Sequence, residues 1–319
     1  MNKVKLSIII VNWNTKELLR QCLNSLVLSI KYHVLRAEII VVDNGSTDGS
    51  VEMVKETIIH NTRQKGGQAP YNIHLIENQS NLGFAKGNNV GIREAQGQYI
   101  MLLNSDTIIR EGAIQGLMEA IDRYDTRQMT AASPSLLLPD GKFQNDYYMK
   151  FPNLWQIFLY HNPVLRPLMM KIPLLSSLVV QRPSRDSFVV DQLPGTALMA
   201  ARAVWDKVGR LDEDYKFFFE DVDWCWQAKR AGIKLIVVPE AEIIHLGGGS
   251  WKKRIKENSS DFYYQFFSSM LLFVRKNYPR SRAIIFKWSI ILNFFLTSKP
   301  LLAWQFFKGN GRQKNYLIQ

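Results

Sequence analysis

The residues with the clearest chemical potential directly follow an apolar run. Met101–Leu103 reads as a buried strand and leads into Asn104, Ser105 and Asp106. A carboxylate at the end of a strand lies where open α/β sheets bind ligands, in the crevice beyond the carboxyl ends of the strands. Asp oxygens suit Mg²⁺ or Mn²⁺, which are commonly held by one or two carboxylates plus substrate phosphates. A structural Asx turn after a strand explains the segment equally well, so the other motifs decide.

Polar side chains also end two earlier strand-like runs. Val11, Asn12 and Asn14 stand at the end of the first run, and Asp43 and Asn44 at the end of the second. Asn and Asp can hydrogen-bond base and ribose edges, while loop amides and helix starts can receive phosphates. Three polar endings on one edge of a sheet favour a nucleotide crevice.

The segment 81–89 adds a flexible Gly83 and a cationic Lys86. A diphosphate or nucleobase site would require such a combination. A glycine-containing loop that caps the following helix accounts for the same residues.

Three acids, Glu220, Asp221 and Asp223, stand among bulky apolar residues. Partly desolvated carboxylates have raised pKa values and can act as general bases, whereas acids in a first helical turn also stabilise the helix. Both explanations can hold, with Asp223 serving the helix and Asp221 facing the crevice. A lone His is more often structural than a ligand, but His245 borders a Gly-rich loop, which adds weight to a metal or phosphate role.

The elements that must position these residues alternate between strand and helix patterns. β-branched and apolar runs predict strands, with helix-length amphipathic segments between them. Such alternation predicts an α/β fold with a mostly parallel sheet, flanked by helices and joined by right-handed crossovers. The predicted strands are 6–11, 38–43, 73–77, 99–103, 188–190, 197–200 and 234–238, and the predicted helices are 15–29, 51–59, 83–95 and 221–231.

The composition is that of a folded protein with an excess of positive charge. The 319 residues are 46% apolar and 21% charged, with a net charge of +12. This excess indicates an anionic partner, whether nucleic acid, a phosphorylated substrate or a membrane surface, or simply a solvated basic surface. The two cysteines match no metal or disulfide spacing, which fits a reducing compartment.

The chain divides into a catalytic-type domain over residues 1–255 and an extension over 256–319. Within the first part, residues 139–187 form an insert rich in aromatics, prolines and cations. This insert is either a mobile acceptor-binding or membrane-facing segment or an irregular packed subdomain. The tail is helical, aromatic and basic from residue 261, so it either lies in a membrane interface or packs as a helical cap. No segment reaches the roughly 18 apolar residues that span a bilayer.

With these motifs in order, the chain resembles the inverting family 2 glycosyltransferases of GT-A fold over residues 5–255. It looks most like the rhamnosyltransferase-like branch that builds bacterial cell-surface polysaccharides. The residues that carry the resemblance are 7–14, 41–50, 81–89, 103–106, 195–197, 220–223 and His245. Each motif is modest alone, but the ordered set is specific. The resemblance implies a Rossmann-like GT-A domain followed by the helical extension.

The resemblance also implies a site. It places the metal at Asp106 and His245, and catalysis at Asp221 with Glu220 beside it. The acceptor would lie near Gly195, Thr196 and Trp224. The residues implied for the nucleotide sugar are Val11, Asn12, Asn14, Asp43, Asn44, Gly83, Lys86, Asn104, Ser105 and Asp106. Asn14 and Asp43 would lie at the base and ribose. The chain departs from the family's metal motif at Asn104, where the family has Asp, so only Asp106 supplies a carboxylate.

The implied reaction is a single displacement that inverts the anomeric centre. The donor would carry UDP or dTDP, with rhamnose as one candidate sugar and Mn²⁺ or Mg²⁺ as cofactor. The acceptor would be a hydroxyl of a glycan or of a polyprenyl-diphosphate-linked molecule. The expected location is the cytoplasm, at the inner face of the cell membrane and in contact with anionic lipid.

Three other classes compete with this interpretation. A nucleotide-sugar-binding or scaffold protein without catalysis is favoured by Asn104, while Asp106, Asp221 and His245 speak against it. A nucleic-acid binder fits the charge, but no recognisable module of that kind is present, so no nucleic-acid partner is expected. A dinucleotide-binding dehydrogenase is disfavoured because Asn-Trp-Asn-Thr occupies residues 12–15, where a Gly-rich fingerprint would stand.

Overall fold

The first half of the chain builds the parallel part of a nine-stranded sheet. The computed structural model describes residues 4–32, 36–64, 71–125, 128–144, 147–181, 184, 186–216, 218–247 and 249–308. Parts of the three predicted regions therefore lie outside the described residues. They include residues 1–3 of the catalytic-type domain, residues 145–146, 182–183 and 185 of the insert, and residues 309–319 of the extension. Strands β1 (Leu6–Asn12), β2 (Ala37–Asp43), β3 (Tyr71–Glu77) and β4 (Tyr99–Leu103) pair in parallel in the order β3-β2-β1-β4. Helices α1 (Lys16–Tyr32), α2 (Ser50–Gln64) and α3 (Phe84–Glu94) connect them. The predicted strand-helix alternation is confirmed.

The second half of the sheet is mixed. Strand β8 (Ala197–Ala201) lies antiparallel between β4 and β6 (Thr130–Leu137), and β9 (Lys234–His245) runs parallel to β6. Strands β5 (Thr107–Ile109) and β7 (Phe188–Val189) pair antiparallel with β9. The α/β fold class is therefore confirmed, with antiparallel pairs added around β8 and β9.

Strand β9 is longer than the sequence pattern predicts. It was expected to end at Val238, but it continues to His245 beyond a register shift opposite Pro134 and Ser135 of β6. The continuation pairs His245 with Thr107 of β5. Helices α4 (Ala113–Asp125) and α7 (Arg202–Val208), together with β5 and β6, are further elements that the sequence analysis did not assign.

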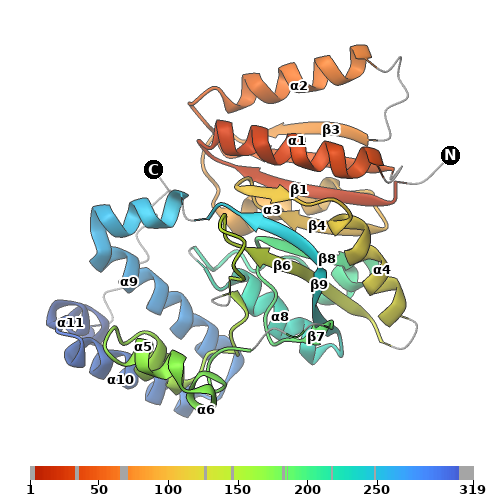
Figure 1. The fold of residues 1–319 in the computed structure, drawn as a ribbon. Helices are drawn as coiled ribbons and strands as arrows, with labels where there is room; N and C mark the ends of the chain where they lie inside the picture. The colour runs from red at the N-terminus through yellow and green to blue at the C-terminus, as the bar shows by residue number, and fades with distance from the viewer. Residues whose placement is uncertain are drawn as a thin grey trace.

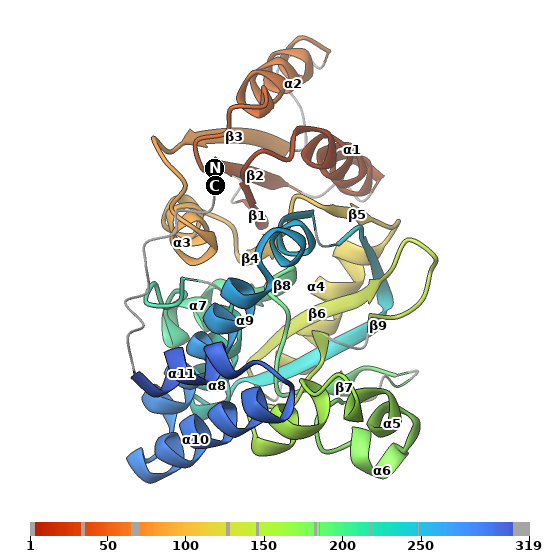
Figure 2. The same cartoon turned by 90° about the vertical axis from the view of Figure 1, so that its left-hand side faces the viewer.

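Two hydrophobic layers enclose the sheet, one on each face (Figures 1 and 2). Ile8 and Ile10 of β1 face the layer covered by α1, α2 and α4, while Ile9 faces the layer covered by α3, α7 and α8 (Glu220–Arg230). Successive side chains of a strand point to opposite faces, so a strand covered on both faces reads as a continuous apolar run. This is why β1 was recognisable in the sequence.

The C-terminal region forms a third cluster beside the sheet. Helices α9 (Gly249–Asn277, with non-helical backbone at Asn258), α10 (Arg280–Leu296) and α11 (Pro300–Lys308) pack around buried phenylalanines such as Phe267, Phe286 and Phe294. The predicted helical character of this region is confirmed. No helix in the described part of the chain is both long and apolar enough to cross a bilayer.

The predicted insert contains short helices with their own small core. The π-helical turn η2 (Gln156–Tyr160) and helices α5 (Leu165–Lys171) and α6 (Pro173–Ser176) enclose Tyr160, Met169, Val179 and Val180. The described residues of this segment therefore enclose a packed core, and an acceptor-binding or membrane-facing role for its outer surface stays a prediction.

Candidate functional site

The carboxyl ends of β1, β2 and β4 open into a cavity of about 280 Å³. Its walls come from strand ends, from the start of α3, from the loop before α8 and from the end of β9. The lining residues are Val11, Trp13, Thr15, Leu18, Asn44, Asn81, Gly83, Phe84, Asn104, Ser105, Asp106, Tyr147, Gly195, Thr196, Tyr215, Lys216, Phe218, Glu220, Asp221 and His245. The cavity therefore lies where parallel α/β sheets bind ligands.

A buried network behind the cavity holds the ends of β1 and β2 together. The Asn12 side chain donates to Asp43 Oδ1 at 2.8 Å and to Ser46 Oγ at 3.1 Å, and Asp43 Oδ2 accepts from the Ser46 amide at 2.8 Å. Asn14, with a left-handed φ of 52°, accepts from the Thr47 amide at 2.7 Å. Asn12, Asn14 and Asp43 are brought together as predicted for neighbouring strand ends, but they lie outside the residues that line the cavity.

The loop before α3 reaches the cavity through amide contacts. Asn44 Nδ2 donates to Asn81 Oδ1 at 3.3 Å and to the Gly83 carbonyl at 3.1 Å. Gly83 adopts a φ of 81°, a left-handed conformation that favours glycine, and its amide donates to Asn81 Oδ1 at 2.8 Å. Lys86 points elsewhere: its Nζ lies 4.0 Å from a Glu213 carboxylate oxygen.

Asp106 and His245 meet at one end of the cavity. The β5–β9 register places His245 Nε2 3.3 Å from Asp106 Oδ1, and the Leu246 amide donates to the Asp106 carbonyl at 2.9 Å. Asn104 and Ser105 lie beside them. The Asn104 amide donates to the Thr196 carbonyl at 2.9 Å. The predicted pairing of the strand end with His245 is thus present in the fold.

Gln144 sets the tautomer of the neutral His245 ring. Its Nε2 donates to the His245 carbonyl at 3.3 Å, which turns its Oε1 toward His245 Nδ1 at 3.1 Å. Nδ1 must then be the protonated donor, and in the neutral ring Nε2 keeps its lone pair. The Nε2 lone pair of His245 and the Oδ1 oxygen of Asp106 are both electron-pair donors, and two such atoms side by side favour a cation between them.

The residues present fit a divalent cation that is shared with a substrate. Adjacent ligands of an octahedral Mg²⁺ lie about 3 Å apart, close to the separation of Asp106 Oδ1 and His245 Nε2. Within the described ranges, no group of three or more His, Cys, Asp or Glu side chains could hold an ion. Asp106 and His245 would supply two ligands, and Mg²⁺-type sites commonly complete their shell with water and substrate phosphates.

Two carboxyl groups, Glu220 and Asp221, also line the cavity. Asp221 Oδ2 accepts from the Gly195 amide at 2.8 Å and its Oδ1 accepts from the Val222 amide at 2.8 Å, so its orientation is held on both sides. Glu220 is only 6% exposed. Burial, with the charge of Asp221 as a second cause, raises the pKa of Glu220 to about 8, and burial also raises the pKa of Asp221.

Glu220→Gln is expected to make the protein more stable at alkaline pH. Because the pKa of Glu220 is about 8 in the folded protein against an ordinary value of 4.5, its stabilising contribution is complete below about pH 4.5 and is lost as pH rises through about 8. The neutral amide avoids that loss. We expect the variant to melt several degrees above the wild type at pH 9 and within about one degree of it at pH 5, by thermal unfolding.

The exposed Glu52→Gln provides the control for this experiment, because Glu52 lies on the surface of α2. The same pH dependence of melting in the wild type and Glu220→Gln would contradict a buried, proton-binding Glu220.

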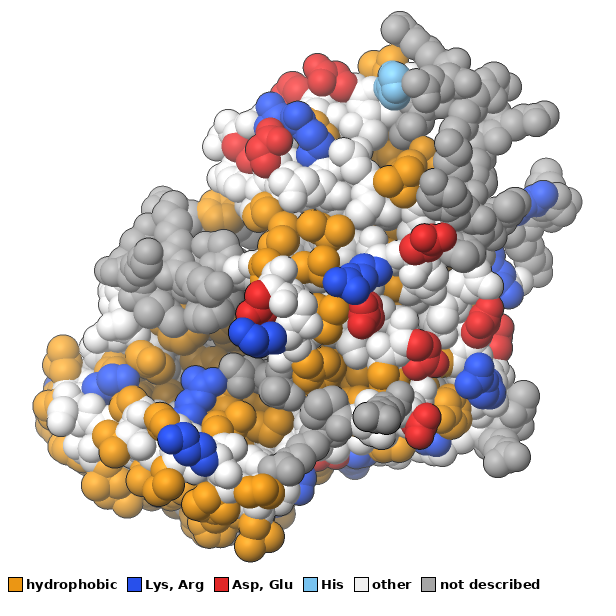
Figure 3. Space-filling view, viewed as in Figure 1, with side chains coloured by type: hydrophobic (Ala, Val, Ile, Leu, Met, Phe, Trp, Pro, Cys, Tyr) orange, Lys and Arg blue, Asp and Glu red, His pale blue; other side chains and the backbone are white. Residues whose placement is uncertain are grey.

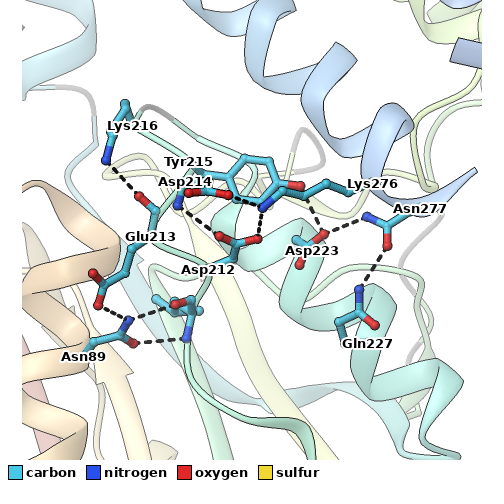
Figure 4. A network of polar contacts seen from close by, with 11 residues as sticks. Asn89, Asp212, Glu213, Asp214, Tyr215, Lys216, Asp223, Gln227, Lys276 and Asn277 are labelled. Atoms are coloured by element: carbon cyan, nitrogen blue, oxygen red, sulfur yellow. Dashed lines mark hydrogen bonds and ion pairs between the residues drawn. The ribbon is translucent and has the colours of Figure 1, made fainter. Parts of the chain in front are cut away.

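A polar network ties the loop before α8 to the C-terminal helices (Figure 4). Tyr215 donates to Asp223 Oδ1 at 3.0 Å, and Asn277 of α9 donates to the same oxygen at 2.7 Å. Lys276 pairs with Asp212, and with Asp214 at 2.7 Å. Asp223 therefore connects α8 to α9 while Asp221 faces the cavity, and α9 holds the loop that brings Tyr215 to the cavity wall.

One predicted acceptor residue is in the wrong place for that role. Trp224 is 2% exposed, packs on Trp205 with ring centroids 4.6 Å apart, and donates its indole N–H to the Gly209 carbonyl at 2.9 Å. It points from α8 into the sheet-facing core, so it is a packing residue. Gly195 and Thr196, the other predicted acceptor-side residues, do line the cavity.

The sequence analysis also missed several contributors. Tyr147, Tyr215, Lys216 and Phe218 line the cavity, and Gln144 orients His245. No residue pattern marked Gln144. The one available signal was the aromatic character of residue 147 and of residues 217–219.

Comparison with known proteins agrees with this geometry. Residues 7–152 match the family model described as glycosyl transferase family 2. An N-acetylglucosaminyl-diphospho-decaprenol L-rhamnosyltransferase of Mycobacterium tuberculosis is 27% identical over 251 residues, 75% of this chain and 75% of its own. A low-salt glycan biosynthesis hexosyltransferase of Haloferax volcanii is 25% identical over 246 residues, 75% of this chain but only 66% of its own length.

The fold comparison reaches further along the chain. The mannosyltransferase PcManGT of Pyrobaculum calidifontis, solved with GDP-mannose and Mn²⁺, superposes with a TM-score of 0.56 at 14% identity. The superposition covers 98% of this chain and 77% of the other. The expected GT-A architecture is confirmed, and residues 7–152 of the chain match the glycosyl transferase family 2 model.

Proposed function

We propose that the protein transfers a sugar, with rhamnose as a candidate, from a UDP- or dTDP-sugar to a hydroxyl of a glycan or lipid-linked acceptor in cell-surface polysaccharide synthesis. The observation that carries this proposal is the convergence on one cavity of a cation-favouring pair, Asp106 and His245, and an oriented carboxyl group, Asp221. Transfer from a nucleoside diphosphate needs both chemistries within reach of one substrate. The mycobacterial relative, named a rhamnosyltransferase that acts on a decaprenol-linked molecule, supports the sugar and acceptor classes.

Asp221 would act as the general base. Its carboxylate takes the proton from the acceptor hydroxyl while that oxygen attacks the anomeric carbon, and the bond to the diphosphate breaks on the opposite face. The configuration inverts, the proton remains on Asp221, and the nucleoside diphosphate leaves with the bonding electron pair. A raised pKa brings the group closer to neutral pH, where a general base works best.

Asp106 and His245 would hold a Mn²⁺ or Mg²⁺ ion together with the donor diphosphate. When bound, such an ion neutralises the charge that develops on the leaving group. Asn104 offers a neutral amide where a second carboxylate would add charge, so metal affinity depends on Asp106, on His245 and on the diphosphate itself.

The remaining predicted contacts divide between the two substrates. Val11, Asn44 and Gly83 line the donor side, with Asn12, Asn14 and Asp43 supporting the strand ends behind them, and Gly195 and Thr196 line the acceptor side. A lipid-linked acceptor would bring the protein to the inner face of the cell membrane.

A binding screen tests the proposal. Nucleoside-diphosphate sugars carrying UDP or dTDP are added with Mn²⁺ or Mg²⁺, and the melting temperature is measured. At a ligand concentration of 100 times Kd the stabilisation is about 2.7 kcal/mol, which raises the melting temperature by several degrees. Stabilisation by one nucleotide class, with release of the nucleoside diphosphate in its presence, is expected. Binding without release favours the scaffold alternative, and the absence of stabilisation by any donor with either metal contradicts the proposal.

A further inference from the structure

Two segments far apart in sequence expose large apolar side chains at the same end of the molecule. We call this the basic apolar face and define it by Val164, Leu168 and Leu174 around α5–α6 and by Trp288, Phe295 and Trp304 on α10–α11. Val164 is 80% exposed and Leu174 76%, while the three aromatic side chains are each more than half exposed. Monomeric proteins rarely leave apolar groups of this size gathered in water.

Helix α10 is apolar on both of its sides. Phe286 and Ile290 pack into the third hydrophobic cluster, whereas Ile285, Trp288 and Leu292 recur at helical spacing on the outer side and are each at least half exposed. A helix that is apolar all round normally has an apolar environment on every side. The outer side of α10 therefore lacks the covering that its sequence fits.

The net positive charge of the chain arises in the same two regions, because they contain basic residues and no acidic ones. Residues 147–185 and 262–319 contain 14 of the 40 Lys and Arg residues and none of the 28 Asp and Glu residues. The rest of the chain holds 26 basic and 28 acidic residues, which nearly cancel. By sequence the net charge of +12 therefore arises in these two regions, of whose basic residues Arg182, Arg185, Arg312 and Lys314 lie outside the described part of the chain.

The two parts of the face lie at one end of the molecule. The turn η2 packs against both α5 and α10, and in Figures 1 and 2 these helices occupy the lower end of the molecule. Figure 3 shows apolar side chains gathered with Lys and Arg at its lower left, over the position of α10, α11 and α5 in Figure 1. The face is also linked to the cavity: Phe262 and Phe266 of α9 contact Phe218 on the cavity wall.

We propose that α5–α6 and α10–α11 dock together, as one surface, on an anionic lipid bilayer. The exposed apolar side chains enter the interface, and the surrounding Lys and Arg lie near the negatively charged headgroups. A second copy of the chain is a poorer occupant, because two such surfaces carry like charge and no acid to offset it. The link from this surface to a lipid-linked acceptor rests on the proposed function, whereas docking itself is measured without any transfer reaction.

Vesicle sedimentation tests the surface. The full chain is mixed with vesicles of phosphatidylcholine alone or of phosphatidylcholine with phosphatidylglycerol. We expect binding to the anionic vesicles only, weakened by at least about tenfold when salt is raised to molar concentration. Equal binding to both vesicle types, or binding to neither, would overturn the proposal.

Two triple variants then ask whether both segments take part. One carries Val164→Ser, Leu168→Ser and Leu174→Ser. The other carries Trp288→Ser, Phe295→Ser and Trp304→Ser. Each is expected to reduce binding to anionic vesicles by at least about tenfold, since each removes three exposed apolar groups from the interface.

The control variant carries Leu28→Ser and Ile59→Ser on α1 and α2. These side chains are 52% and 51% exposed, which is comparable to the aromatic side chains of the basic apolar face, but they lie in a different part of the fold. The control is expected to bind as the wild type does, and all variants are compared by melting temperature. If one triple variant binds vesicles as well as the control does, docking by a joint surface is wrong. If the wild type forms a concentration-dependent dimer that both triple variants abolish, the face binds a second copy of the chain instead. Donor-induced stabilisation in the triple variants reports separately on the proposed function.

Discussion

Replacing Asp221 with Asn is expected to lower turnover by about 100-fold or more while leaving donor binding close to that of the wild type. Asn keeps the size of the side chain, and its oxygen can still accept from the Gly195 or Val222 amide, as the carboxylate does at 2.8 Å. What it loses is the capacity to accept a proton from the acceptor hydroxyl. The measurement is steady-state transfer, or donor hydrolysis, together with donor affinity by calorimetry.

The pH profile makes this test specific. In the wild type, burial raises the pKa of Asp221, and it also raises that of the neighbouring Glu220, so turnover should climb with pH as the pair loses its proton. The residual activity of Asp221→Asn should lack that rise. Near-normal turnover in the variant, or an unchanged pH profile, would remove Asp221 from the role of base.

Asp223→Asn serves as the matched control on the same helical turn. The Asp223 carboxylate faces Tyr215 and Asn277 rather than the cavity. Its replacement should lower the melting temperature, because a buried charge-assisted contact is weakened, and should retain most of the turnover. A loss of turnover equal to that of Asp221→Asn would show that the effect comes from disturbing α8.

Replacing Asp106 with Ala is expected to weaken metal-dependent donor binding by about 100-fold or more. Because Asn104 is uncharged, Asp106 is the one carboxylate in this motif, and its Oδ1 lies 3.3 Å from His245 Nε2. Loss of an outer partner of a metal ligand commonly costs 10- to 100-fold in metal affinity, so loss of a ligand itself should cost at least the upper value. Calorimetry with donor, in the presence and absence of Mn²⁺, measures the effect.

Gln144→Ala provides a graded comparison. It removes the group that turns His245 Nε2 toward Asp106 and leaves both proposed ligands in place. We expect a loss of about 10- to 100-fold, smaller than that of Asp106→Ala. Donor affinity that responds to Mn²⁺ equally in the wild type and Asp106→Ala would exclude Asp106 from the metal site.

The parallel half of the fold was predictable from local pattern. Residues 8–11 and 39–42 are continuous β-branched runs, because helices cover both faces of the sheet there. Strands β5 and β6 and helices α4 and α7 were not assigned. β5 has three residues, too few to establish a period, and β6 contains Ser133, Pro134 and Ser135, which interrupt an apolar run although all eight positions are buried.

The candidate site divides in the same way. The polar strand ends are visible in the sequence because each follows a recognisable strand, and the acids at 220 and 221 are visible because they begin a recognisable helix. Trp224 was misplaced because its environment is set by distant residues: its ring packs on Trp205 and its indole N–H donates to the Gly209 carbonyl. Gln144 was invisible because its role depends on a contact with the distant His245.

The amino-acid sequence alone therefore indicated the resemblance to family 2 glycosyltransferases, the α/β order of the first half and the kinds of chemical group at the strand ends, since these depend on neighbours along the chain. Tertiary structure decided which groups meet. Asp106 joins His245 only because β9 passes a register shift and pairs with β5, and the acids reach the same cavity only because α8 packs at the end of the sheet. Asn104-Ser105-Asp106 gains a partner through strand pairing between distant segments, and such pairing leaves no local signature in either of them.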